Sequence, residues 1–154
     1  MTAAPSVQGT ATELRSVANS FSKELMSVDA RAAARRPAAG AWSPKEVLGH
    51  LIDSAANNHQ RFVRAQQADR LVLPGYEQNH WVSSQGYQDA DWAHLVTLWT
   101  HLNLHLADVM AHIPPDKYNV SCVIDDSQPL TLEALVIDYL GHLQHHMAQI
   151  RERL

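Results

Sequence analysis

The chain has 154 residues, of which 45% are hydrophobic and 18% charged, and this balance predicts a single globular domain over residues 1–154. A net charge of -4, without a long run of Lys and Arg, argues against a nucleic-acid partner. No segment reaches the roughly 20 apolar residues of a membrane span, and residues 1–5 lack the basic and apolar parts of a signal peptide. A single cysteine, Cys122, excludes an internal disulfide, so we expect a soluble cytoplasmic protein in which Cys122 is structural.

Two amphipathic segments in the first half of the chain predict helices. The first covers residues 14–28, where apolar side chains recur at helical spacing. The second covers about 43–68 and opens on a capping-box signature. There Ser43 caps the helix, Pro44 takes its first position and Glu46 reaches back to the cap.

Residues 73–81 are rich in aromatic and polar side chains and predict a loop. A third helix is expected from about Asp89, with an unbroken apolar stripe that ends before Pro114. Residues 116–130 read as irregular, apart from a short extended piece at 120–124.

Thr131 is expected to cap a fourth helix that runs to about residue 150. Four helices without a convincing sheet predict an all-α fold. The expected form is an up-and-down four-helix bundle, although its long connections allow crossovers.

His142 and His146 lie one turn apart on the fourth predicted helix, with Cβ atoms about 6 Å apart. Two imidazoles in this arrangement can share one divalent metal ion. His146 falls inside the apolar arc of the helix, His142 lies at its margin and His145 points elsewhere. A site that holds a metal and leaves a position open needs a third protein ligand.

The histidines of the third predicted helix form a row on one flank of its apolar stripe, which favours a solvent-exposed edge over a metal site. They are His94, His101, His105 and His112.

His50 lies on a polar strip of the second predicted helix, together with Ser54, Asn57 and Arg61. Periodicity alone favours a surface position for His50. A polar cleft inside the bundle would reverse that assignment, and spacing does not decide between the two.

Three stretches resemble the DinB/YfiT-like superfamily of metal-binding four-helix bundles. They are Trp42-Ser43-Pro44-Lys45-Glu46-Val47-Leu48-Gly49-His50-Leu51-Ile52-Asp53-Ser54, then Gly75-Tyr76-Glu77 with Trp81-Val82, then Leu130-Thr131-Leu132 leading to Tyr139-Leu140-Gly141-His142-Leu143-Gln144-His145-His146-Met147-Ala148-Gln149-Ile150. The similarity spans about residues 8–152. It implies that His50, His142 and His146 form a metal triad and that His101 and His105 are not ligands.

Three imidazoles would leave one or more metal positions for water or substrate. Zn(II), Ni(II) and Fe(II) all suit this ligand set. Such a metal can lower the pKa of bound water towards about 7 or stabilise a thiolate or enolate. Glu46, Asp53 and Asp138 lie three or four residues from a ligand, so each can orient one, although Glu46 has its capping role and Asp138 can simply face water.

The resemblance implies a metal-dependent enzyme. Within that superfamily the resemblance implies either thiol-S-transferase or hydrolase activity, and of the two we favour transfer of a low-molecular-weight thiol, as cosubstrate, to an electrophilic small molecule. A metal-dependent hydrolase is the alternative, for which only Asp53 and Glu77 offer a general base. Arg61 could meet an anionic substrate group, and Tyr76 and Trp81 could line the pocket, although a surface arginine and loop-pinning aromatics are simpler assignments.

The alternative to an enzyme is a bundle that binds a metal or another ligand without catalysis. The resemblance also implies a homodimer. Trp92 and Trp99 could serve an interface, but their place in the apolar stripe favours core packing.

Overall fold

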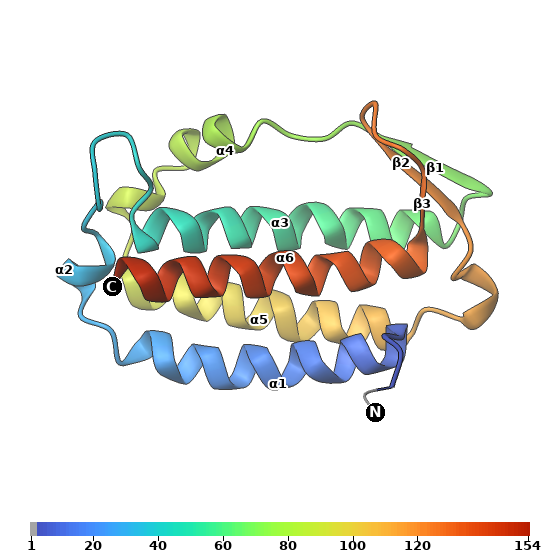
Figure 1. The fold of residues 1–154 in the computed structure, drawn as a ribbon, viewed down its shortest axis with the longest axis horizontal. Helices are drawn as coiled ribbons and strands as arrows, with labels where there is room; N and C mark the ends of the chain where they lie inside the picture. Colours follow the sequence, from blue (N-terminus) through green and yellow to red (C-terminus); the bar gives the residue numbers. More distant parts are fainter. Residues whose placement is uncertain (1–2) are drawn as a thin grey trace.

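The computed structural model describes residues 3–154, so Met1 and Thr2 of the N-terminal segment lie outside the described residues. Four long helices form its body, which confirms the predicted all-α bundle (Figure 1). They are α1 (Val7–Met26), α3 (Pro44–Ala65), α5 (Trp92–Ala111) and α6 (Leu132–Arg153).

The predicted helix starts are realised by side-chain caps. The Ser43 side chain accepts a hydrogen bond from the backbone N–H of Glu46, and the Glu46 carboxylate accepts one from the N–H of Ser43, so the capping box is complete. Thr131 caps α6 through Ala134, as expected. Helix α5 begins later than predicted, after its cap Asp91, because residues Tyr87–Asp89 form a separate 3-10 turn.

The order of helix directions differs from a simple up-and-down bundle. Helices α1 and α6 run one way along the long axis and α3 and α5 run the other (Figure 1). Each of α1 and α3 packs against both α5 and α6. Because α3 and α5 are parallel neighbours, the chain must return along the bundle between them, and residues 66–91 form this crossover.

The crossover is more ordered than the loop predicted from its sequence. It contains strand β1 (Arg70–Leu73) and a short helix, α4 (Gln78–Ser84), which overlaps the predicted loop at 73–81. Glu77 caps α4 by accepting hydrogen bonds from the backbone N–H groups of Asn79 and His80. The cap supplies local order that hydrophobic periodicity does not report.

A small sheet at one end of the bundle was also missed. Strand β2 (Ser121–Ile124) coincides with the expected extended piece and pairs in parallel with β1 and antiparallel with β3 (Leu130–Thr131). Such short strands are recognised only when their partners are known, and β1 lies about 50 residues before β2 in the chain. A four-residue helix, α2 (Ala30–Ala33), links α1 to α3.

The core lies between the four long helices. Trp99 is fully buried, and Trp92 is buried with its indole N–H donating to the Leu25 carbonyl, so both tryptophans serve the core. The four histidines of the predicted flanking row are exposed, as expected: His94, His101 and His105 in α5, and His112 at its C-cap. Cys122 is buried. None of the helices between residues 3 and 154 combines the length and apolar character that a membrane span requires.

Candidate metal centre

The three histidines singled out by the resemblance lie together inside the bundle. Nε2 of His142 is 3.4 Å from Nε2 of His50 and 3.1 Å from Nε2 of His146. One ring nitrogen from each residue lies within 4.8 Å of the others. Two imidazole nitrogens bound tetrahedrally to one ion at about 2.0–2.1 Å are about 3.3 Å apart. The donor set therefore fits a single divalent ion.

Two facing helices create this convergence. Helix α6 presents His142 and His146 one turn apart, and α3 packs against α6 and presents His50 from the opposite side. The ring centroids of His50 lie 5.3 Å from His142 and 4.7 Å from His146. The cluster is thus defined by helix packing between residues about ninety positions apart in the chain.

The surface position that periodicity favoured for His50 is wrong, since the residue is 0% exposed. Its helix is covered on more than one side, because the crossover packs on α3 in addition to α5 and α6. Gly49 permits this close approach: a Cβ at that position would lie 2.1 Å from Cδ2 of Tyr87. His50 and Ser54 of the polar strip are buried and Asn57 and Arg61 are partly buried, which agrees with the cleft alternative.

Two neighbours of the histidines were not identified from the sequence. The indole of Trp42 lies 5.2 Å from the His50 ring at an interplanar angle of 38°. Nδ1 of His146 lies 2.8 Å from Oε1 of Gln149. The spacing of Gln149, three residues after His146 on the same helix, was the available signal.

Burial keeps these imidazoles neutral. It is the main cause that lowers the pKa of His50 and of His142 to about 4, and neighbouring imidazoles add to the effect in each case. The pKa of His146 is also lowered by burial, against the opposing hydrogen bond to Gln149. Neutral rings have a lone pair available for a cation near neutral pH.

The carboxylates considered as histidine partners have other contacts. Glu46 binds Arg36 through both carboxylate oxygens, and this contact is the main cause that lowers its pKa. Oδ1 of Asp53 accepts hydrogen bonds from the Tyr87 hydroxyl at 2.6 Å and from Gln85 at 2.7 Å. Asp138 is exposed. Within residues 3–154, none of these three carboxylates hydrogen-bonds to a ligand histidine.

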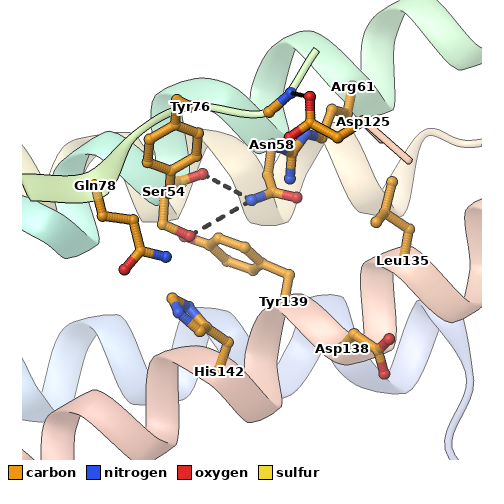
Figure 2. Close-up of a pocket in the computed structure, with 11 residues that line it drawn as sticks. Ser54, Asn58, Arg61, Tyr76, Gln78, Asp125, Leu135, Asp138, Tyr139 and His142 are labelled. Carbon is orange, nitrogen blue, oxygen red and sulfur yellow. Dashed lines mark hydrogen bonds between the residues drawn. The ribbon is translucent and has the colours of Figure 1, made fainter. Parts of the chain in front are cut away.

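A cavity of about 290 Å³ opens beside the histidine cluster (Figure 2). Its walls come from α3, the crossover, the turn after β2, and α6. The lining residues are Ser54, Asn58, Arg61, Gly75, Tyr76, Gln78, Asp125, Leu135, Asp138, Tyr139 and His142. The cavity therefore brings one prospective metal ligand, His142, to a space that polar and apolar side-chain surfaces line about equally.

The structure treats the remaining predicted site residues differently. Arg61 and Tyr76 line the cavity. Trp81 is not among the lining residues and instead packs on Tyr76, with ring centroids 5.1 Å apart. Glu77 is exposed, and both of its carboxylate oxygens cap α4.

Comparison with known proteins relates both the sequence and the fold to one group. Residues 13–150 match the model of the DinB superfamily. YfiT of Bacillus subtilis (strain 168), whose name assigns it provisionally to the metal-dependent hydrolases, is 24% identical over 114 residues, which are 73% of this chain and 64% of that protein. A relative from Halalkalibacterium halodurans with a name of the same kind is 23% identical over 119 residues, 73% of this chain and 66% of the relative.

The chain thus spans just under two thirds of the length of these two relatives. The solved structure of Bacillus subtilis YfiT, described as a four-helix bundle of unusual topology, superimposes with a TM-score of 0.84 at 21% identity. The superposition covers 96% of this chain and 85% of that one, which shows a shared fold. The family match extends over nearly all of the four-helix body, and on this ground the chain belongs to the DinB superfamily.

Proposed function

We propose that this chain is a metal-dependent enzyme in which His50, His142 and His146 hold one divalent ion. The observation that carries the proposal is the convergence of three Nε2 atoms beside a cavity that His142 lines. Zn(II), Ni(II) and Fe(II) all accept such a ligand set. A bound ion would supply Lewis acidity, lowering the pKa of a thiol or water that enters the cavity.

The reaction we favour is transfer of a low-molecular-weight thiol to an electrophilic small molecule. The thiol sulfur forms a bond to the electrophilic carbon, the leaving group departs with the bonding electron pair, and the thiol proton passes to solvent. This reaction needs no carboxylate base from the protein. The two carboxylates considered as bases have other contacts: the oxygens of Glu77 cap a helix, and Oδ1 of Asp53 accepts hydrogen bonds from Tyr87 and Gln85.

Hydrolysis is the second candidate, and the names of the two relatives favour it. Water would add to a carbonyl carbon, and the bond from that carbon to the leaving group would break, with the leaving group keeping the electron pair and taking up a proton. Tyr76 and Asn58 in the cavity wall would hold the substrate. Asp138 is exposed and lies in the same wall as His142, so it is the carboxylate best placed to accept a proton from that water.

The two reactions are separated by one assay on protein loaded in turn with zinc, nickel and iron. We would supply 1-chloro-2,4-dinitrobenzene with a panel of small thiols, and separately a panel of nitrophenyl esters without thiol. Thiol-dependent release of chloride supports the transferase. If esters are cleaved without thiol and no thiol supports turnover, the transferase proposal is wrong and the hydrolase proposal is supported.

A third outcome, stoichiometric metal without turnover in either panel, would support a binding protein without catalysis. The predicted homodimer is a separate proposal, since Trp92 and Trp99 are buried in the core and offer no interface. Light scattering at working concentration tests it, and a monomeric mass refutes it.

A further inference from the structure

Arg61 is a partly buried cation in the wall of the cavity, away from the histidine cluster. Figure 2 shows Arg61 and His142 on opposite sides of the space, from α3 and α6 respectively. Along α3, Arg61 lies eleven residues after His50, or about 16 Å at the rise of a helix. The cavity therefore has a reactive side and a cationic side.

Within residues 3–154, no acidic group lies at ion-pair distance from this arginine. The ion pairs within residues 3–154 are made by other arginines, at Arg15, Arg36 and Arg151. Burial lowers the pKa of Arg61, while Tyr76 and Asp125 act in the opposite direction through charge and not through a hydrogen bond. A guanidinium that has lost part of its hydration without gaining a partner favours an anionic ligand.

Asp125 is the carboxylate whose charge acts on Arg61, and one of its oxygens already has a hydrogen-bond partner. Its Oδ1 accepts a hydrogen bond of 2.7 Å from the backbone N–H of Gly75, which ties the crossover to the turn after β2. Gly75 has no room for a side chain there, since a Cβ would lie 2.2 Å from Oδ2 of Asp125. Asp125 thus shapes the wall near Arg61, and within residues 3–154 no hydrogen bond joins its carboxylate to the guanidinium.

We propose that Arg61 binds a carboxylate on the substrate or thiol cosubstrate, while the reacting atom of the same molecule lies at the histidine cluster. This inference rests on the proposed function. The planar guanidinium can donate two parallel hydrogen bonds to the two carboxylate oxygens. The separation of the two sides selects an elongated molecule, with its charge at one end and its reactive atom at the other.

The charged side chains that line the cavity also limit the charge of the anion that can bind there. Asp125 and Asp138 both line it, so two negative charges accompany the one guanidinium. A phosphate dianion would meet repulsion from these carboxylates, whereas a single carboxylate adds one charge and matches the fork of Arg61. A monocarboxylate is therefore the ligand class that this arrangement fits.

The first experiment does not depend on the metal. In metal-free protein, the side-chain Nε–H signal of Arg61 is followed by nitrogen-15 NMR during titration with butyrate, and separately with butyramide as the neutral match. We expect butyrate to shift the signal and butyramide to leave it in place. Equal responses to the two compounds, or no response to butyrate, overturn the inference whatever the metal content.

The second experiment uses zinc-loaded protein and mercaptocarboxylates of increasing chain length, each matched by the mercaptoalcohol of the same length. Calorimetry should show that the best-fitting carboxylate binds about tenfold more tightly than its alcohol. Arg61→Gln should abolish this preference and leave alcohol binding unchanged. Arg61→Lys should retain only part of it, because an ammonium lacks the planar fork.

Arg64→Gln is the matched control, since Arg64 is exposed on the same helix and bonds to Gln60 outside the cavity. It should keep the full preference. A preference that survives Arg61→Gln, or its absence in the wild type, refutes the role of Arg61. Failure of the wild-type protein to take up zinc instead refutes the metal site, and the butyrate titration still decides the inference about Arg61.

Discussion

Oε1 of Gln149 lies 2.8 Å from Nδ1 of His146, one turn further along α6. An amide oxygen only accepts hydrogen bonds, so Nδ1 must carry the ring proton and the lone pair must lie on Nε2. Nε2 is the atom that lies 3.1 Å from Nε2 of His142 in the cluster. Gln149 therefore selects the tautomer and the ring orientation that a metal site requires.

Replacing Gln149 by Leu should weaken metal binding by about 10–100-fold, because the ring of His146 would lose the partner that orients it. Competition with a chelating dye measures the affinity. Gln144→Leu is the control, since Gln144 is exposed on the same helix and donates to Glu13. Wild-type affinity in Gln149→Leu would show that packing alone orients the ring.

His50→Ala and His142→Ala should each abolish stoichiometric metal uptake, because two imidazoles are too few ligands to retain the ion. Elemental analysis of the purified protein after dialysis against zinc measures the metal content. His105→Ala is the control, as His105 is exposed on α5 and packs edge-on against His59. Full metal retention in either of the first two variants would show that the ion binds elsewhere.

Gly49→Ala should destabilise the protein by about 1–3 kcal/mol, as overpacking does in a filled interior. The new methyl group would lie 2.1–2.7 Å from ring atoms of Tyr87, which would have to move and would strain its hydrogen bond to Asp53. Thermal unfolding followed by circular dichroism measures the change.

Gly141→Ala provides the opposite case within the same fold. Gly141 is exposed in α6, and a Cβ there would meet no atom within 4 Å. Alanine should raise stability by up to about 1 kcal/mol, since it favours the helix over glycine. If both substitutions lowered the melting temperature equally, close packing of Tyr87 on Gly49 would not be the cause.

The contact between Glu46 and Arg36 should make stability depend on acid pH. Arg36 is the main cause that lowers the pKa of Glu46 below its ordinary value of 4.5, so the folded state binds fewer protons than the unfolded state there. The stabilisation is fully present above about pH 4.5 and is lost as the pH falls through the lower pKa of the folded state. Arg36→Gln should therefore flatten the decline of stability on the acid side of pH 4.5.

Urea unfolding at a series of pH values measures this dependence. Arg35→Gln is the control, because Arg35 is the exposed neighbour and makes no ion pair within residues 3–154. It should follow the wild-type curve. If Arg36→Gln also followed the wild-type curve, carboxylates other than Glu46 would cause the loss of stability at acid pH.

Local features of this protein follow directly from its sequence. The capping box of Ser43 and Glu46 and the cap at Thr131 depend on neighbours three residues away, so they were recognised without tertiary information. The one-turn spacing of His142 and His146 is likewise a property of a single helix. The exposed row of histidines on α5 was also predicted from periodicity within one element.

The position of His50 was decided only by the tertiary structure. On its own helix the residue belongs to a polar strip, and hydrophobic periodicity treats such a strip as surface. It is buried because α3 packs on α6 and the rings of Trp42, His142 and His146 lie against it, so a side that a lone helix would expose becomes interior. Resemblance to a family had paired His50 with the other two histidines, but only the packing of α3 on α6 supplied the distances between them.

The cavity, with Arg61 on one side and His142 on the other, was likewise decided only by the tertiary structure. Arg61, Asp125 and His142 come from segments far apart in the chain, and neither their shared space nor the engagement of Asp125 by Gly75 can be read from spacing. Periodicity describes how one element divides its residues between core and solvent. Polar side chains become buried where several elements pack together, and this packing is determined only by the tertiary structure.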